Sequence, residues 1–227
     1  MKNSGKRAAV IAAHPDDEIL GCGGTISRMA SEGIDVYVLI LGQGLAARGK
    51  SGSALTRSLK ELRVCGQKAN KAVGSYKVVF LDFPDNKLDS VPLLNITKAV
   101  ESFIASIKPE KIFTHSRKDL NIDHRICADA VLTATRPLPG NFVRSVYAFE
   151  VLSSSEWNFG EFFSPNVFID ISAHIDAKKK AISEYTSEIR EYPHPRSLKG
   201  VEALASYRGI QSGLPYAEAF LAVRIIK

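Results

Sequence analysis

The residues of this chain that are best suited to chemistry form two short clusters of acids and histidines. Residues 14–18 read His-Pro-Asp-Asp-Glu, and residues 123–124 read Asp-His. His14 and Asp17 lie three positions apart, and a helix that starts between them directs an imidazole nitrogen and a carboxylate oxygen to one point, as a metal site requires. We expect His124 to supply the third ligand. Two imidazoles and one carboxylate leave a coordination position open, which is typical of a catalytic site and not of a closed structural one.

Asp16 lies between two of these ligands, and we expect it to stay outside the coordination sphere, where it can accept a proton from bound water. Helix capping is the alternative interpretation of the same run, because proline and acidic residues are favoured in a first helical turn. Capping accounts for Pro15 and for one acid, but not for three successive acids behind a histidine. The sequence leaves both interpretations open.

The elements that position these clusters are indicated by short apolar segments that alternate with segments of helical periodicity. The pattern predicts strands over 8–13, 35–41, 77–81, 111–114, 143–151, 167–170 and 218–226, and helices over 16–31, 55–73, 91–107, 123–135, 173–190 and 197–212. This alternation is typical of an α/β fold with a Rossmann-like, mostly parallel sheet and helices on both faces. We expect a single domain over 1–227, with a core at 8–150 and a C-terminal α+β elaboration at 151–227.

Polar residues follow three of the predicted strands at their carboxyl ends, where ligands bind in open parallel sheets. They are His14, Asp16, Asp17 and Glu18 after the first strand, Asp82 and Asp85 after the third, and His115, Asp119, Asn121, Asp123 and His124 after the fourth. Such convergence on one edge favours a functional site there. His115 either supports the metal ligands from behind or is an ordinary buried histidine.

Two motifs resemble those of a known family. The run from Ala13 to Glu18, followed by Gly21-Cys22-Gly23-Gly24, resembles the opening motif of the PIG-L/LmbE-like zinc-dependent N-deacetylases, and Asp123-His124-Arg125 resembles a later one. The likeness extends over residues 8–150, and Phe83-Pro84-Asp85-Asn86, Arg208-Gly209 and Ala217-Glu218-Ala219-Phe220 resemble a bacterial branch. The resemblance implies removal of acetyl from an N-acetylated, GlcNAc-like amino sugar or glycoconjugate, with Zn²⁺ or another divalent metal such as Fe²⁺. It also implies a homo-oligomer.

Carried over position by position, the resemblance assigns zinc binding to His14, Asp17 and His124 and the general-base role to Asp16. Many members carry a histidine, assigned to transition-state stabilisation, at the position that Asn121 occupies here.

An amide donates a hydrogen bond to an oxyanion but does not titrate. Either Asn121 acts in this role, or His194 replaces it from a proline-rich loop, where functional side chains are common. A surface histidine in a turn is the other interpretation of His194.

Substrate contacts are expected from Arg48, Asp85, Arg196 and Arg208. Arg48 lies in a glycine-rich loop after the second strand, and Asp85 lies in a turn after the third. The alternative for each is a solvated charge or a turn residue. An aromatic cluster around Trp157 either stacks on a sugar ring, forms a subunit contact or packs in the core.

The composition sets limits on the class of protein. The 227 residues are 45% hydrophobic and 24% charged, which excludes intrinsic disorder, collagen and coiled coil. The three cysteines are far apart and form no CxxC pair, so neither a disulfide framework nor a cysteine zinc site is expected. No apolar stretch approaches the roughly 20 residues of a membrane span. We expect a cytoplasmic protein without a transmembrane segment.

Four rival functions are less consistent with the sequence. A dinucleotide site conflicts with the acidic residues at the phosphate turn, which would repel a pyrophosphate. An iron oxygenase shares the ligand set but is usually a β-barrel, and a phosphoesterase would need ligands for a second metal. A basic module that binds nucleic acid or anionic lipid, with a vestigial metal site, fits the net charge of +6. Since the basic residues form no stripe, no nucleic-acid partner is expected.

Overall fold

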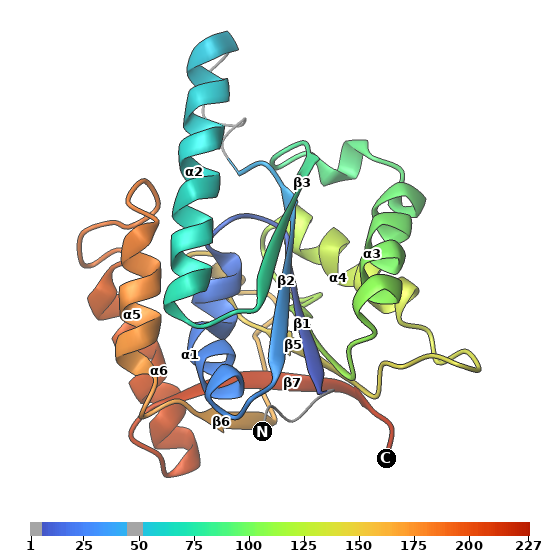
Figure 1. The fold of residues 1–227 in the computed structure, drawn as a ribbon. Helices are drawn as coiled ribbons and strands as arrows, with labels where there is room; N and C mark the ends of the chain where they lie inside the picture. The colour runs from blue at the N-terminus through green and yellow to red at the C-terminus, as the bar shows by residue number, and fades with distance from the viewer. Residues whose placement is uncertain (1–5, 45–51) are drawn as a thin grey trace.

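A computed structural model describes residues 6–44 and 52–227, and the strands of this part form one sheet in the order β3-β2-β1-β4-β5-β7-β6 (Figure 1). The strands are β1 Arg7–Ala12, β2 Asp35–Gly42, β3 Lys77–Phe83, β4 Lys111–His115, β5 Ser145–Phe149, β6 Val167–Asp170 and β7 Ala217–Ile225. The pairs from β3 across to β5 are parallel, whereas β7 runs antiparallel to both β5 and β6. The predicted mostly parallel α/β sheet is confirmed.

Helices cover both faces of the sheet, as predicted (Figure 1). They are α1 Asp17–Ser31, α2 Gly52–Ala72, α3 Leu93–Ile107, α4 Ile122–Ala134, α5 Ile175–Glu184 and α6 Leu198–Ser212, with short 3-10 turns at Leu88–Ser90 and Ser155–Trp157. α1, α2, α5 and α6 lie on one face, and α3 and α4 lie on the other. Among the described residues, the helices are too short or too polar to cross a membrane.

The central strand β1 is buried on both faces, which explains its continuous apolar sequence. Ala8 and Val10 pack in the core on the α1 side, while Ala9 and Ile11 pack in the core on the α3 side. β1 pairs in parallel with β2 on one side and with β4 on the other. The order of connection therefore reverses between β1 and β4, and such a switch point is where open α/β sheets bind ligands.

The glycines of α1 allow the helix to pack tightly against the sheet and against the segment that follows β6. A Cβ atom on Gly21 would lie 2.4 Å from the Phe149 side chain, and one on Gly24 would lie 2.7 Å from Ile171. Only glycine fits such approaches without displacing a neighbour. The glycine-rich part of the motif is thus explained by packing and not by phosphate binding.

The helix predicted over 173–190 is shorter in the structure, since α5 ends at Glu184. Tyr185 follows directly, is fully buried and donates a hydrogen bond from its hydroxyl to Glu18 Oε1 at 2.5 Å. Tyr185 thus contacts α1 at the point where α5 ends. A contact between distant segments of this kind cannot be predicted from the periodicity of the local sequence. The strand predicted over 143–151 is also shorter and spans Ser145–Phe149.

Candidate functional site

The three predicted metal ligands converge at the switch point between β1 and β4. Asp17 Oδ2 lies 3.3 Å from His14 Nδ1 and 3.3 Å from His124 Nε2. Two ligands bonded to one zinc ion at about 2.1 Å are separated by about 3.4 Å in a tetrahedral site. Asp17 Oδ1 and His124 Nε2 are buried without a hydrogen-bond partner, so they are available as ligands. The three residues therefore fit a divalent metal.

The imidazole of His14 is oriented by carboxylates on its far side. Its Nε2 forms a hydrogen bond of 2.9 Å with Asp123 Oδ2 and lies 3.5 Å from Asp85 Oδ1. Burial opposes the charged form of His14, but Asp123 and Asp17 outweigh it and raise its pKa to about 10. With Nε2 engaged in this way, Nδ1 is the nitrogen that faces Asp17 and the candidate metal position.

His124 is held in a similar way by a different carboxylate. Its Nδ1 lies 3.0 Å from Asp119 Oδ1, which leaves Nε2 directed at Asp17. Burial lowers the pKa of His124, but Asp17 and Asp119 outweigh it and raise the pKa to about 9. Burial likewise opposes ionisation of Asp17, yet His124 holds the pKa of Asp17 well below its usual range. A carboxylate behind a ligating histidine is the usual way to fix the ring and its tautomer.

His115 lies directly behind the ligands, as one of its two interpretations predicted. Its ring stacks on that of His124, with centroids 4.0 Å apart, and its Nε2 accepts a hydrogen bond of 2.8 Å from the Ala13 amide. Burial lowers its pKa well below the usual range. The neutral ring therefore supports the end of β1 and the face of His124.

Asp16 has an unusual backbone conformation, with a φ of 102° at the N-terminal boundary of α1. Such a φ in a residue other than glycine costs on the order of 1–3 kcal/mol and needs outside support. Glu18 gives that support, since its Oε2 accepts the Asp16 amide at 3.0 Å while its Oε1 accepts hydrogen bonds from Asn70 and Tyr185. Asp16 makes no side-chain cap of the helix, so capping does not explain this residue.

Asp16 is only 2% exposed to solvent. Its carboxylate is paired with a cation, since Arg196 Nη1 donates a hydrogen bond to its Oδ2 at 2.9 Å. Burial raises the pKa of Asp16 well above its usual range, although the guanidinium opposes this shift. Arg196 also donates to Ser153 Oγ at 2.6 Å and to Glu188 Oε2 at 3.4 Å. Arg196 therefore holds the carboxylate of Asp16 in one orientation.

A small pocket of about 80 Å³ opens over these groups. It is lined by His14, Pro15, Asp16, Gly44, Asp85, Asn86, Asn121, Glu188 and Arg196. Asn121 caps α4 by accepting the Asp123 amide at 2.8 Å, and its Nδ2 donates to Asn86 Oδ1 at 3.2 Å. The lining is strongly polar, and part of it comes from the loops that follow β3 and α5.

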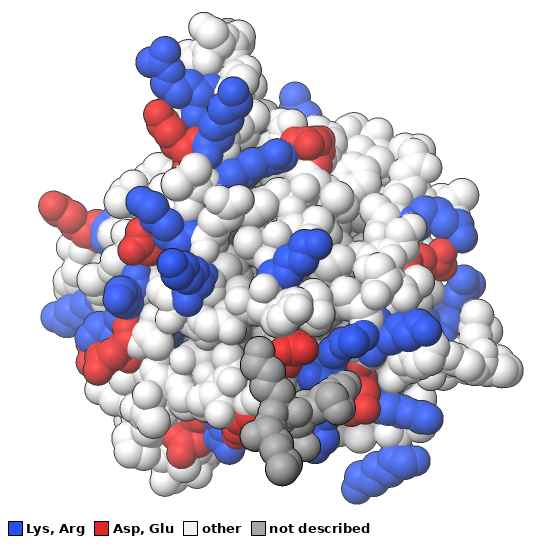
Figure 2. Space-filling model, in the orientation of Figure 1, with Lys and Arg blue, Asp and Glu red and all other residues white. Residues whose placement is uncertain are grey.

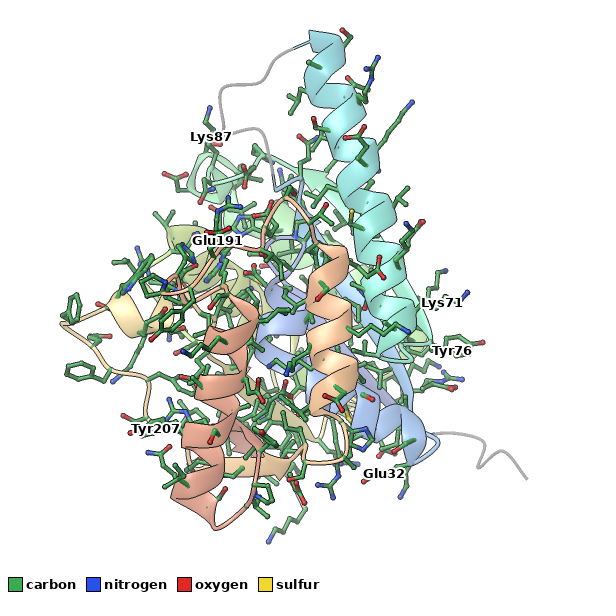
Figure 3. All side chains as sticks on the ribbon, turned by 90° about the vertical axis from the view of Figure 1, so that its left-hand side faces the viewer. Glu32, Lys71, Tyr76, Lys87, Glu191 and Tyr207 are labelled. Atoms are coloured by element: carbon green, nitrogen blue, oxygen red, sulfur yellow. The ribbon has the colours of Figure 1, made fainter. Side chains whose placement is uncertain are left out.

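Those two loops lie at the same end of the molecule, as Lys87 and Glu191 show in Figure 3. Glu32, just after the last residue of α1, lies at the opposite end (Figure 3). The N-terminus of α1 therefore points to the site, and the helix runs away from it.

The other predicted residues have different surroundings. His194 is not among the residues that line the pocket: its ring meets the edge of Trp157, with centroids 6.0 Å apart, and its Nδ1 accepts the Arg196 amide at 3.1 Å. Arg208 does not line the pocket either. Its Nε and Nη2 donate to the two carboxylate oxygens of Glu150, at 2.7 and 2.6 Å. Arg48 lies outside the described residues.

The sequence did not single out Glu188, Ser154 or Ser155 as residues of the site. The pairing of Arg196 with Asp16 and Glu188, and the support of Asp119 by Ser154 and Ser155, join segments that are distant along the chain. For the contacts of Ser154 and Ser155 with Asp119, the run of three serines at 153–155 was the only local signal in the sequence.

The surface charge of the molecule is mixed on the face shown in Figure 2, where Lys and Arg side chains are interspersed with Asp and Glu. Among the described residues on that face, the basic side chains form no continuous stripe. This pattern gives no support to the alternative in which the chain is a basic binding module.

Comparison with known proteins agrees with the geometry. Diacetylchitobiose deacetylase of Thermococcus kodakarensis is 28% identical and covers 95% of this chain and 82% of its own length. A probable N-acetyl-alpha-D-glucosaminyl L-malate deacetylase 2 of Bacillus cereus is 27% identical over 81% of this chain and 84% of its own. The structure of N,N'-diacetylchitobiose deacetylase from Pyrococcus horikoshii has the same fold, with a TM-score of 0.79 at 18% identity over 97% of this chain and 85% of that one.

The family model described as "PIG-L: GlcNAc-PI de-N-acetylase" matches residues 9–135, a span that holds both motifs and all three candidate metal ligands. This span is more than half of the chain, and it ends just beyond α4. The chain therefore belongs to the PIG-L family.

Proposed function

We propose that this protein is a metal-dependent amide hydrolase that removes the acetyl group from an N-acetylated amino sugar or its conjugate. The observation that carries the proposal is the meeting of His14, Asp17 and His124 at one point, beside a buried Asp16 that belongs to the same pocket. The family and the deacetylases to which the chain is similar support the same reaction.

The nature of the ligands favours Zn²⁺ as the metal. Two imidazoles and one carboxylate are typical catalytic zinc ligands, and a closed structural site would have a fourth protein ligand. A zinc ion held by His14, Asp17 and His124 would supply Lewis-acid chemistry: it would lower the pKa of a water molecule to about 7 and polarise a carbonyl group.

Asp16 is well placed to be the general base. Its carboxylate lines the pocket next to the ligands, and a raised pKa brings a carboxyl group closer to the pH at which proton transfer in both directions is efficient. Asp16 would take a proton from water as the water attacks the acetamide carbonyl. It would then return that proton to the departing amine, which leaves acetate and a free amino sugar.

Asn121 is the better candidate of the two proposed oxyanion donors. Its side chain lines the pocket, whereas His194 lies behind Arg196 against Trp157. The loss of one oxyanion donor typically costs about 2.7–4 kcal/mol of transition-state stabilisation. We assign this role to Asn121, and we assign to His194 the support of the loop that carries Arg196.

The lining of the pocket suits a substrate with several hydroxyl groups. Asp85, Asn86 and Glu188 place carboxylate and amide groups around a small opening, and such groups can hydrogen-bond to sugar hydroxyls. A site built in this way rejects analogues that lack the hydroxyls, because its polar groups would then stay unpaired. Asp85 is therefore retained as a proposed substrate contact, while Arg196 is proposed to act on Asp16.

The test is acetate release from N-acetylglucosamine and from diacetylchitobiose, by purified protein with and without a chelator, followed by restoration with Zn²⁺. We expect activity that the chelator abolishes and Zn²⁺ restores. Asp16→Asn should keep its metal, as measured by elemental analysis, and lose most turnover. His124→Ala should lose the metal itself. Acetate release that survives both the chelator and Asp16→Asn would refute the proposal.

A further inference from the structure

The connection between β5 and β6 reaches both sides of the site through three consecutive serines. Ser153 Oγ accepts a hydrogen bond of 2.6 Å from Arg196, the residue that holds the proposed base. The hydroxyls of Ser154 and Ser155 both donate to Asp119, the carboxylate behind His124. A single short segment thus contacts the partner of the base and the partner of a metal ligand.

Asp119 depends on these hydroxyls for its orientation. The residue is fully buried, and its Oδ1 receives Ser154 Oγ and the Asn121 amide, the latter at 2.9 Å, while its Oδ2 receives Ser155 Oγ at 2.6 Å. A buried carboxylate is stable only when its oxygens are hydrogen-bonded. Donors on both oxygens also prevent the carboxylate from rotating.

The orientation of Asp119 is passed on to His124. Its Oδ1 lies 3.0 Å from His124 Nδ1, and the opposite ring nitrogen, Nε2, faces Asp17. Partners of this kind fix both the tautomer and the direction of a ligating imidazole. If the Asp119 carboxylate rotates or shifts, the His124 ring turns with it, and Nε2 points less directly at the candidate metal position.

We propose that Ser154 and Ser155 are positioning residues that set the affinity of the His14–Asp17–His124 site for a divalent metal by holding Asp119 against His124. The inference rests on the metal site of the proposed function, but not on the identity of the substrate. Loss of a direct partner of a ligating histidine typically weakens metal binding about 10- to 100-fold. For a hydroxyl that acts one step further out, we expect a weakening of about 3- to 10-fold, at or below the lower end of that range.

The experiment is a titration of Zn²⁺ into metal-free protein in competition with a chromophoric chelator. Ser154→Ala should bind Zn²⁺ about 3- to 10-fold more weakly than the wild type. Ser164→Ala is the matched control, because Ser164 lies in the same connection with an exposed side chain whose Oγ is 3.5 Å from the Phe162 carbonyl. It should bind Zn²⁺ as the wild type does.

A double-mutant cycle tests whether the effect passes through Asp119. In an Asp119→Asn background, Ser154→Ala should weaken Zn²⁺ binding little further, because the group on which Ser154 acts has already been changed. Equal losses in both backgrounds, or no loss in either, would overturn the proposal. If Ser154→Ala does not fold, Ser155→Cys serves in the same cycle, since it keeps the side chain nearly the same size but is a weak donor.

Ser153→Ala provides a contrast within the same run of serines. Ser153 contacts Arg196 and not Asp119, so this variant should retain wild-type Zn²⁺ affinity. A loss equal to that of Ser154→Ala would show a general effect of the loop and refute the proposal. Wild-type protein that binds Zn²⁺ but releases no acetate would contradict only the proposed function, whereas wild-type protein that binds no metal would contradict both.

Discussion

Two neighbouring lysines of α5 test how burial changes the contribution of an ion pair to the stability of the fold. Lys178 is 3% exposed, and its Nζ lies 2.6 Å from Glu218 Oε1 and 2.7 Å from the Leu20 carbonyl. Lys179 is on the same helix, and its Nζ lies 2.8 Å from Glu202 Oε2, but these two side chains are 29% and 40% exposed. The pairing distances are similar, but the two pairs differ strongly in their contact with water.

The buried pair also joins α1 to the C-terminal strand. Glu218, on β7, accepts hydrogen bonds from the amides of Gly24 and Thr25 within α1, at 2.9 and 2.7 Å. If Lys178 is removed, the Glu218 carboxylate stays buried without its cation and the Leu20 carbonyl loses a donor. We therefore expect Lys178→Met to destabilise the fold far more than the loss of a surface charge would.

The magnitude follows from the two environments. Breaking a buried pair by removing one partner costs about 3–5 kcal/mol. An exposed pair contributes about 0–1 kcal/mol. For a protein of this size, each kcal/mol shifts the Tm by about 2–4 °C. Lys178→Met should therefore lower the Tm by about 6–20 °C, and Lys179→Met by less than about 4 °C.

Urea unfolding followed by circular dichroism, together with thermal unfolding, measures both variants against the wild type. The double variant Lys178→Met/Glu218→Gln should lose less than the sum of its single changes, because it leaves no unpaired charge in the core. Similar losses for Lys178→Met and Lys179→Met would refute the reasoning. A loss below about 1 kcal/mol for Lys178→Met would refute it as well, since that is the range of a surface pair.

Three further predictions concern the site. Asn121→Asp keeps the helix cap but replaces the amide donor with a negative charge. The kcat should therefore fall about a hundredfold with little change in Tm. An unchanged kcat would show that Asn121 does not bind the oxyanion. Trp157 is 42% exposed beside His194. If it stacks on a second sugar ring, Trp157→Ala should raise the KM for diacetylchitobiose about 2- to 10-fold and leave that for N-acetylglucosamine unchanged, and equal effects would exclude stacking. Because a metal that binds only the folded state stabilises it, a chelator should lower the Tm of the wild type but not of His124→Ala, as thermal unfolding would show.

The convergence of the three candidate metal ligands could be predicted from the sequence, because each follows a strand that the sequence also predicts. His14 and Asp17 are close in the chain, so local helix geometry brings them together. His124 lies in the first turn of α4, which follows β4 along the chain, and the switch-point rule places the end of β4 beside that of β1. The prediction therefore needed only one long-range contact, that between the ends of β1 and β4. The structure brings the three candidate ligand atoms into one cluster.

The roles of the arginines could not be predicted in the same way. Arg196 and Arg208 both lie in the C-terminal part of the chain, and the sequence offers each as a substrate contact. In the structure Arg196 meets the buried carboxylate of Asp16, 180 residues earlier in the chain, whereas Arg208 pairs with Glu150. Charge and exposure cannot be read from local sequence here, because the decisive partner of each arginine is supplied by a distant element.

The three successive acids of the first motif show why a run of similar residues need not share a function. Asp17 begins α1, and its carboxylate turns back to accept the His14 amide at 2.8 Å and face the metal position. Glu18, one residue further along the helix, points instead into the core, where Asn70 and Tyr185 donate to it. Burial raises the pKa of Glu18 to about 7, although these donors oppose the shift.

Asp16 precedes the helix with a positive φ of 102°, and its carboxylate pairs with Arg196, whereas that of Asp17 faces the two histidines. The helix dipole favours all three acids equally at the N-terminus, so it cannot explain their different surroundings. Their environments differ because one residue lies before the helix and the next two occupy different faces of its first turn. The order of the acids therefore matters as much as their charge: Asp17 faces the metal position because of its place in the turn, Asp16 is free to face the pocket, and Glu18 keeps Asp16 in the conformation that makes this possible.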